Sequence, residues 1–149
     1  MKPRMISLDE SQLKAMAGYV GYERGMWDWV IVQLRDDRES SHLRNAYTNE
    51  FLLHSRSLTE FLRSEPRKDD VVAAHFVPDW PGKDDDDVAY LVETLEVTNK
   101  RWAHISAYRL QEGKEAADLE RWNRSVHHLE IAWGRFLRSL TPERRAWFA

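Results

Sequence analysis

The chain has 149 residues, long enough for one domain with its own core, and contains no cysteine, which excludes disulfides, thiolate metal sites and cysteine nucleophiles. Its net charge of −3 excludes the general positive field that most nucleic-acid-binding proteins carry. No apolar run approaches the length of a signal peptide or a membrane span, so we expect a cytoplasmic protein without membrane contact.

The first predicted helix begins at a capping box formed by Ser7 and Glu10. Apolar residues then recur every three or four positions, which is the period of one buried helical face: Leu13, Met16, Val20, Trp27, Ile31 and Leu34. Gly18, Gly21 and Gly25 interrupt this helix, and each costs about 1 kcal/mol relative to alanine. We expect them to permit close helix packing; the alternative is a kink that splits the helix.

The second predicted helix runs from about Ser41 to Ser64, ahead of Pro66. Its apolar stripe contains Leu43, Tyr47, Phe51, Leu58 and Phe61. His54 falls within that stripe, and its buried ring needs hydrogen-bond partners, which we expect a neighbouring helix to supply. Alternatively, His54 and Glu50 form a metal or acid-base element, although di-iron bundles repeat a Glu-x-x-His motif that this spacing does not match.

The segment from Asp69 to Trp80 does not have the pattern of an amphipathic helix and is the expected interhelical loop. Its aspartates and His75 are suited to binding a hard cation or orienting a water molecule. Its apolar side chains favour a hydrophobic plug that caps one end of the bundle: Val71, Val72, Phe76, Val77 and Trp80. We prefer the plug, which would also serve as a pocket wall.

The third predicted helix begins near the aspartate run at 84–87 and continues to about Leu110. Its buried line comprises Leu91, Leu95, Trp102 and Ile105. Polar residues lie beside this line, on an edge that either faces a groove or is simply solvated: Asn99, Lys100, Arg101, His104, Tyr108 and Arg109.

The fourth predicted helix has alternating three- and four-residue steps between apolar residues, the pattern of an a/d seam: Leu119, Trp122, Val126, Leu129, Trp133, Phe136 and Leu140. Thr141 and Pro142 then begin a short helix that carries Trp147 and Phe148 back over the bundle. We therefore predict an all-α fold spanning 1–149 as a single domain. Its expected architecture is an up-down four-helix bundle with a short C-terminal extra helix and a structured loop between helices two and three.

Charge is uneven along the chain. Residues 65–87 contain eight acidic and three basic side chains, whereas residues 119–149 contain six arginines and three glutamates. On the fourth helix, His127 and His128 lie near Arg121, Arg124 and Arg135. This short basic stripe either contacts phosphates or forms a salt-bridged surface, and the acidic segment argues against general nucleic-acid affinity.

Three stretches, LLHSRSLTEFL, DDVVAAHFVPDW and NKRWAHISAYRL, resemble a family of small uncharacterised bacterial all-helical proteins. The matching positions span the middle half of the chain: His54, Arg56, Leu58, Phe61, Asp69, Asp70, Trp80, Lys100, His104 and Arg109. The family brings no established activity. The resemblance implies that these polar residues form one site across helices two and three.

A weaker resemblance is to HEPN-type domains, all-α bundles that often act as ribonucleases in bacterial toxin and defence systems. Their motif is an arginine followed four to six residues later by a histidine. Arg121 with His127 or His128 satisfies that spacing, as does Arg35 with His42, although Trp122 stands where the motif usually has a polar residue. The resemblance implies that Arg121 and His128 activate a ribose hydroxyl and stabilise phosphate charge.

Our leading hypothesis is a bundle that works through protein–protein contacts as a homodimer or with another protein, because seven tryptophans exceed what one small core needs. The alternatives are a ribonuclease and a metal- or small-ligand-binding bundle. The residues expected to bind a ligand are His54, Arg56, Asp70, Trp80, Lys100 and His104. A metal site, which the pattern does not favour, would use Glu50, His54 and His104. The sequence implies no cofactor and assigns no enzymatic activity.

Overall fold

The computed structural model describes residues 5–36, 38, 40–67, 69–98 and 115–149, apart from the side chains of 115–118. Within these described residues there are five α-helices: α1 (Glu10–Arg35), α2 (Ser41–Arg63), α3 (Asp86–Thr98), α4 (Glu115–Ser139) and α5 (Pro142–Ala146). Two short 3-10 helices, η1 (Ala73–His75) and η2 (Gly82–Asp84), connect α2 to α3. The described residues contain no strand, which confirms the all-α class. The predicted extension of the third helix to Leu110 lies outside the described residues.

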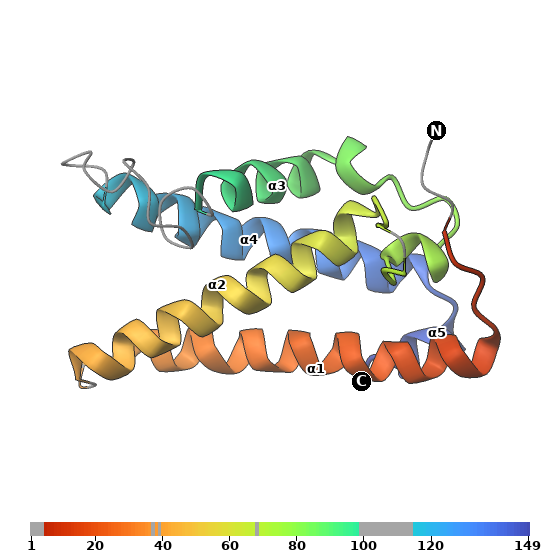
Figure 1. Ribbon diagram of the computed structural model, residues 1–149, viewed down its shortest axis with the longest axis horizontal. Helices are drawn as coiled ribbons and strands as arrows, with labels where there is room; N and C mark the ends of the chain where they lie inside the picture. The colour runs from red at the N-terminus through yellow and green to blue at the C-terminus, as the bar shows by residue number, and fades with distance from the viewer. Residues whose placement is uncertain (1–4, 37, 39, 68, 99–114) are drawn as a thin grey trace.

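The helices pack as two adjacent pairs (Figure 1). The most extensive contacts are between α1 and α2 and between α3 and α4, and α2 also packs against α3. Figure 1 shows α5 beside the first part of α1, so that the C-terminus ends next to that helix. Within the described residues, no helix has the length and apolar character needed to cross a lipid bilayer.

The helices begin with capping residues of the predicted kind, but the capping box of α1 lies further along the chain than expected. The capping box of α1 uses Asp9 and Gln12 instead of Ser7 and Glu10. The Gln12 backbone N–H donates to Asp9 Oδ1 over 2.8 Å, and the Asp9 N–H donates to Gln12 Oε1 over 3.0 Å. Since α1 runs unbroken from Glu10 to Arg35, the alternative in which its glycines split the helix is wrong.

Aromatic rings form the centre of the core at the end of the bundle where η1 and α5 meet. The ring of Phe148 lies 5.2 Å from that of Phe76 and 5.3 Å from that of Phe136, in edge-on contacts that favour aromatic packing. Phe76 and Trp80 are buried, and Trp80 Nε1 donates to the Leu62 carbonyl over 2.6 Å. The interhelical segment is therefore the predicted plug, and the C-terminal helix returns over the bundle as expected.

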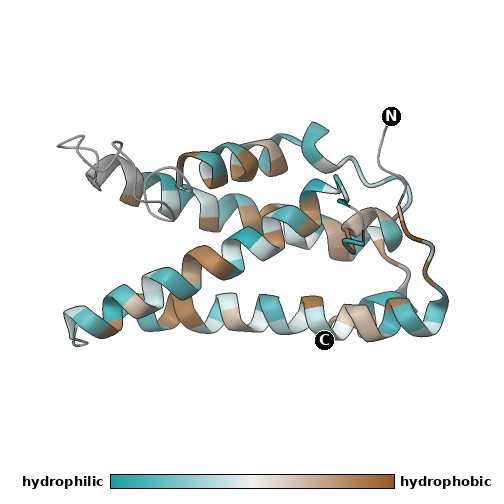
Figure 2. Ribbon diagram, viewed as in Figure 1, coloured by the Kyte–Doolittle hydropathy of each residue, from teal (hydrophilic) through white to brown (hydrophobic). Residues whose placement is uncertain are grey.

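The predicted apolar seam of α4 is buried over its second half but is exposed at its start. Leu129, Trp133 and Phe136 are buried, whereas Leu119 is 58% exposed, so its predicted core position is wrong. Leu119 lines an open cleft of about 370 Å³ between α4 and the α1–α2 pair. Figure 2 colours the ribbon by hydropathy and shows hydrophobic segments along α3 and the part of α2 beside it.

Candidate functional site

The structure brings two of the predicted ligand-binding residues to one cavity. Arg56 on α2 and Asp70 in the following loop both line a hollow of about 390 Å³ between α1, α2 and that loop. Trp80 lies instead in the core and lines a separate hollow of about 580 Å³. Lys100 and His104 lie outside the described residues. Arg56 and Asp70 thus share one cavity, while the single site across helices two and three stays a prediction.

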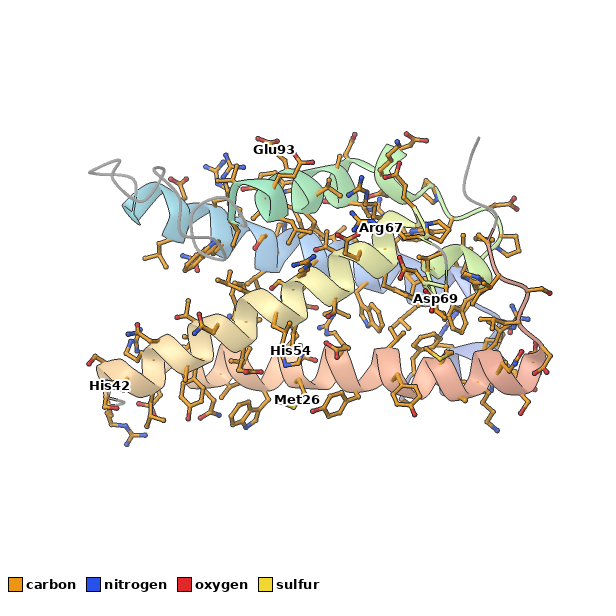
Figure 3. All side chains as sticks on the ribbon, in the orientation of Figure 1. Met26, His42, His54, Arg67, Asp69 and Glu93 are labelled. Carbon is orange, nitrogen blue, oxygen red and sulfur yellow. The ribbon has the colours of Figure 1, made fainter. Side chains whose placement is uncertain are left out.

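The cavity at Arg56 combines an apolar floor with a polar rim. Its floor is formed by Met16, Val20, Leu58, Phe61, Val71 and Val72. Arg56 and Arg67 are both exposed at its rim, and neither guanidinium forms an ion pair within the described part of the chain. Asp70 is engaged with the backbone N–H of Arg67 over 2.9 Å, and Figure 3 shows Arg67 at the end of α2. Apolar walls with a few polar groups are typical of small-molecule sites.

His54 is buried at the contact between α2 and α1 and is only 4% exposed (Figure 3). Its Nδ1 lies 2.7 Å from Glu23 Oε2 on α1, which is hydrogen-bond distance. Its Nε2 lies 3.3 Å from Glu50 Oε2, but without hydrogen-bond geometry. The preferred prediction, a buried histidine bonded to a neighbouring helix, is confirmed, and Glu23 is the partner that the apolar pattern did not reveal.

A metal site at His54 finds no complete ligand set in the described residues. No group of three or more histidine, aspartate or glutamate side chains there is placed to hold a metal ion. Glu50 and His54 are neighbours, while the third predicted ligand, His104, lies outside the described residues. The contact between His54 and Glu23 is best described as a structural one that joins α2 to α1.

Four polar side chains join α3 to α4 in one network. His128 Nδ1 lies 2.7 Å from Asp87 Oδ1, and its ring stacks on Tyr90 with 4.1 Å between centroids. Arg135 pairs with Asp87 and with the buried Asp85, whose carboxylate also accepts the Val88 N–H at the start of α3. Burial alone would raise the pKa of Asp87, but the hydrogen bonds from His128 and Arg135 lower it overall. The network fixes α3 on α4.

Both members of the predicted ribonuclease pair contact carboxylates of α3. Arg121 lies 3.3 Å from Glu93, which Figure 3 shows on the side of α3 away from α2, while His128 binds Asp87. Seven residues separate the pair on α4, about 10 Å along the axis. The other arginine–histidine match, Arg35 and His42, consists of exposed residues flanking the α1–α2 turn. His127 is exposed on α4.

Sequence reasoning missed a second line of residues on α1, on the side opposite its core stripe. We call this line the outer seam of α1. Its members follow alternating four- and three-residue steps, and every one of them is exposed: Ser11, Ala15, Gly18, Tyr22, Gly25, Trp29 and Val32. Tyr22 is 60%, Trp29 47% and Val32 61% exposed. Figure 3 shows Met26, which borders the seam, pointing away from α2. The spacing alone could have revealed this seam.

The glycines of the outer seam have no packing role among the residues that the structure describes. A Cβ atom added to Gly18 or Gly25 would meet nothing within 4 Å, whereas one on Gly21 would lie 3.5 Å from the Phe148 carbonyl. The predicted close packing is therefore observed only at Gly21. Gly18 and Gly25 weaken the helix by about 1 kcal/mol each without a packing contact from the described residues in return.

The tryptophans divide unequally between core and surface. Trp27, Trp80 and Trp133 are buried, Trp122 and Trp147 are partly buried, and Trp29 is exposed. The core thus uses most of the described indole rings, and the abundance of tryptophan is weaker support for an interface than we expected. Trp29 alone among them lies on the outer seam, held in an edge-on contact with Tyr47 at 5.6 Å between centroids.

Comparison with protein-family models, with curated proteins and with solved structures finds no match to this chain. The two family resemblances therefore stay predictions.

Proposed function

We propose that this protein works through protein–protein contacts made by the outer seam of α1. The single observation that carries the proposal is the exposed line of small and apolar residues on the face of α1 opposite the core. A helix that packs on one face only ordinarily presents charged and polar residues to solvent. An apolar stripe on both faces is the pattern of a helix with two packing partners.

Two physical features support this proposal. Exposed aromatic rings are the side chains that dominate the binding energy of protein interfaces, and Tyr22 and Trp29 lie two turns apart on one line. Trp29 is also held against Tyr47, so less rotamer freedom is lost when a partner covers the indole. In Figure 2 the middle of α1 is largely pale, as expected for a helix whose outward residues include glycines and aromatic rings.

The test is the assembly state of the purified protein over a wide concentration range, measured by sedimentation velocity. We expect self-association that Tyr22→Glu and Trp29→Glu abolish. The matched control is Leu53→Glu, which places the same charge on an exposed apolar residue of α2. Circular dichroism confirms that each variant remains folded. A wild-type protein that stays monomeric at millimolar concentration, or equal loss of assembly in Leu53→Glu, contradicts the proposal.

A second candidate function is the binding of a small acidic amphipathic ligand in the cavity lined by Arg56. Its volume of about 390 Å³ lies within the range of roughly 300–1,000 Å³ typical of small-molecule sites. The cavity is lined by three carboxylates, Glu23, Glu60 and Asp70, as well as by the two arginines, so it is the exposed guanidinium of Arg56 that would bind the acidic group of a ligand whose short apolar chain lies on the apolar floor.

Octanoate is a suitable probe for this candidate, with binding measured by isothermal titration. We expect a single saturable site whose affinity falls at least tenfold in Arg56→Ala. Arg138→Ala, which removes an exposed arginine from α4, serves as the matched control. Absence of saturable binding, or equal binding by the Arg56 variant, eliminates this candidate.

A further inference from the structure

We infer that the partner of the outer seam is a second copy of this chain, with its α1 antiparallel to the first and the two helices centred on residue 20. This inference rests on the proposed function and identifies its partner and geometry. It follows from the order of large and small residues along the seam and from the charges on one flank.

Large and small residues alternate along the outer seam so that it is complementary to itself only when reversed. In an antiparallel pair centred on residue 20, Tyr22 faces Gly18 of the second copy, and Trp29 faces Ser11. Ala15 faces Gly25 in the layer between them. Each aromatic ring thus packs into the space left by a small residue, as a knob enters a hole in a coiled coil.

A parallel pair in register lacks this complementarity. It would place Tyr22 against Tyr22 and Trp29 against Trp29, with the helices held apart by the rings. Gly18 and Gly25 would then face their own copies across a void, and lost contacts in voids are costly. The alternation of sizes therefore favours the antiparallel direction.

Two antiparallel registers place each large residue of the seam opposite a small one. Charge on one flank of α1 distinguishes between them. Lys14 and Asp28 each directly precede a seam residue, so both lie on the same flank of α1. With the centre at residue 20, Lys14 and Asp28 of the second copy lie on the same flank with an offset of about 3 Å along the axis, within reach of each other, and the symmetry of the pair repeats this contact. A register shifted by one heptad, centred between residues 23 and 24, would place Lys14 against Arg35.

Both flank residues are available for this contact. Lys14 is exposed and forms no ion pair within the residues that the structure describes. The Asp28 side chain is 52% exposed although it also binds Arg24 at 2.9 Å, so its outer face stays open to a second cation. Gly21 lies between them on the same flank, where the carbonyl of Phe148 approaches. The C-terminal residues therefore border the centre of the inferred interface.

The geometry predicts an unusual result for two charge-reversed variants. Homodimers of Lys14→Asp bring two negative charges together at each of the two flank contacts, and homodimers of Asp28→Lys bring two positive charges together there. In a heterodimer of the two variants both flank contacts join opposite charges, because one copy is negative at positions 14 and 28 and the other copy is positive at both. Because exposed ion pairs contribute roughly 0.2–1 kcal/mol each, we expect each variant alone to dissociate about tenfold more readily than the wild type. The mixture should recover much of that loss by forming heterodimers.

The experiment measures dimer dissociation for each variant and for their equimolar mixture by sedimentation at low ionic strength. Heterodimers that form preferentially support the inference. In the shifted register Lys14→Asp would instead face Arg35 and strengthen the homodimer, and that outcome overturns the inferred register. A mixture no tighter than the separate variants also overturns it.

An independent distance measurement tests the direction of the helices. The chain has no cysteine, so Arg35→Cys accepts a single spin label per copy at the exposed end of α1. At 1.5 Å per residue, the antiparallel pair centred on residue 20 separates the two labels by about 45 Å along the axis. A parallel pair brings them to roughly 10 Å. A dimer that depends on Tyr22 but shows the short distance overturns the inference while leaving the proposed function intact; a protein that never dimerises overturns both.

Discussion

The two longest helices, α1 and α4, differ in what they present to solvent. The exposed positions of α4 are mainly polar or charged, including Glu120, Arg124, Glu130 and Arg138. The corresponding positions of α1 include the aromatic and glycine residues of the outer seam, flanked by Lys14 and Asp28. Both helices bury one face in the same core. The difference shows that α4 buries its seam except near Leu119, whereas α1 carries a second, exposed line of small and aromatic residues that no described part of the chain covers.

Polar groups follow the same division. On α4, His128 and Arg135 are joined to carboxylates of α3, and Ser125 donates to the Trp122 carbonyl. On α1, Arg24 bridges to Glu130 over 2.7 Å from the inward-facing side. The polar groups that point inward are thus largely matched, and three of the exposed large apolar side chains, Tyr22, Trp29 and Val32, follow one line on α1.

The largest expected effect is at the α4 core. Phe136 is fully buried among five aromatic rings, and we expect Phe136→Ala to lower the free energy of unfolding by about 3–5 kcal/mol. Urea denaturation of dilute protein measures this change. Leu119→Ala, on the same helix but exposed, is the control and should change stability by less than about 0.5 kcal/mol. Similar losses at both positions would contradict the division of α4 into buried and open parts.

A smaller effect is expected at the contact between α1 and α2. Glu23→Ala removes the carboxylate that binds His54 Nδ1, and leaving a buried polar group unsatisfied costs about 1–3 kcal/mol. Glu50→Ala is the matched control, because its contact with the same ring lacks hydrogen-bond geometry. Thermal unfolding of both variants should rank Glu23→Ala as clearly the more destabilised. The opposite ranking would show that Glu50 is the principal partner.

The α3–α4 network should make stability depend on pH in the acid range. Because the folded state lowers the pKa of Asp87, this carboxylate contributes stability above its ordinary unfolded pKa. That contribution is lost as the pH falls through the lower folded pKa, when the carboxylate takes up a proton. Asp87→Asn should therefore lower stability at pH 7 by about 1–3 kcal/mol and flatten the acid limb of the pH profile. An unchanged acid limb would show that other carboxylates control it.

The sequence predicted the helices well because their signals are local. Periodic apolar residues located α2 and most of α4, and Thr141 with Pro142 located the start of α5. The start of α1 was placed two residues early because Ser7 and Asp9 are both good caps, and only the observed backbone distinguishes them. Leu119 fits the α4 pattern equally well, but the neighbouring helices diverge there, which the sequence of one helix cannot reveal.

Candidate sites were harder to predict because they depend on contacts between elements. His54 was correctly singled out, yet its partner Glu23 lies on another helix at no recognisable spacing. Arg56 and Asp70 share a cavity, whereas the indole of Trp80 turns into the core to reach the Leu62 carbonyl. The outer seam was recognisable from its heptad spacing, but its significance depends on knowing which face of α1 the core covers.

The smallest predicted effect gives the most direct contrast between the two faces of α1. Since nothing lies near the missing Cβ of Gly18 or Gly25, alanine at either position should stabilise the dilute monomer by about 1 kcal/mol through helix propensity. The same methyl groups would occupy the holes into which Tyr22 and Ala15 of a second copy pack, so dimer dissociation should become easier. Gly82→Ala is the contrasting variant, because Gly82 has φ of +58° and its Cβ would collide with the Arg63 carbonyl. Urea unfolding and sedimentation of the same samples separate the two effects. If alanine at Gly18 or Gly25 stabilises the fold but weakens the dimer, these glycines serve an interface. If fold and dimer are both stabilised or both weakened, their role lies within the monomer.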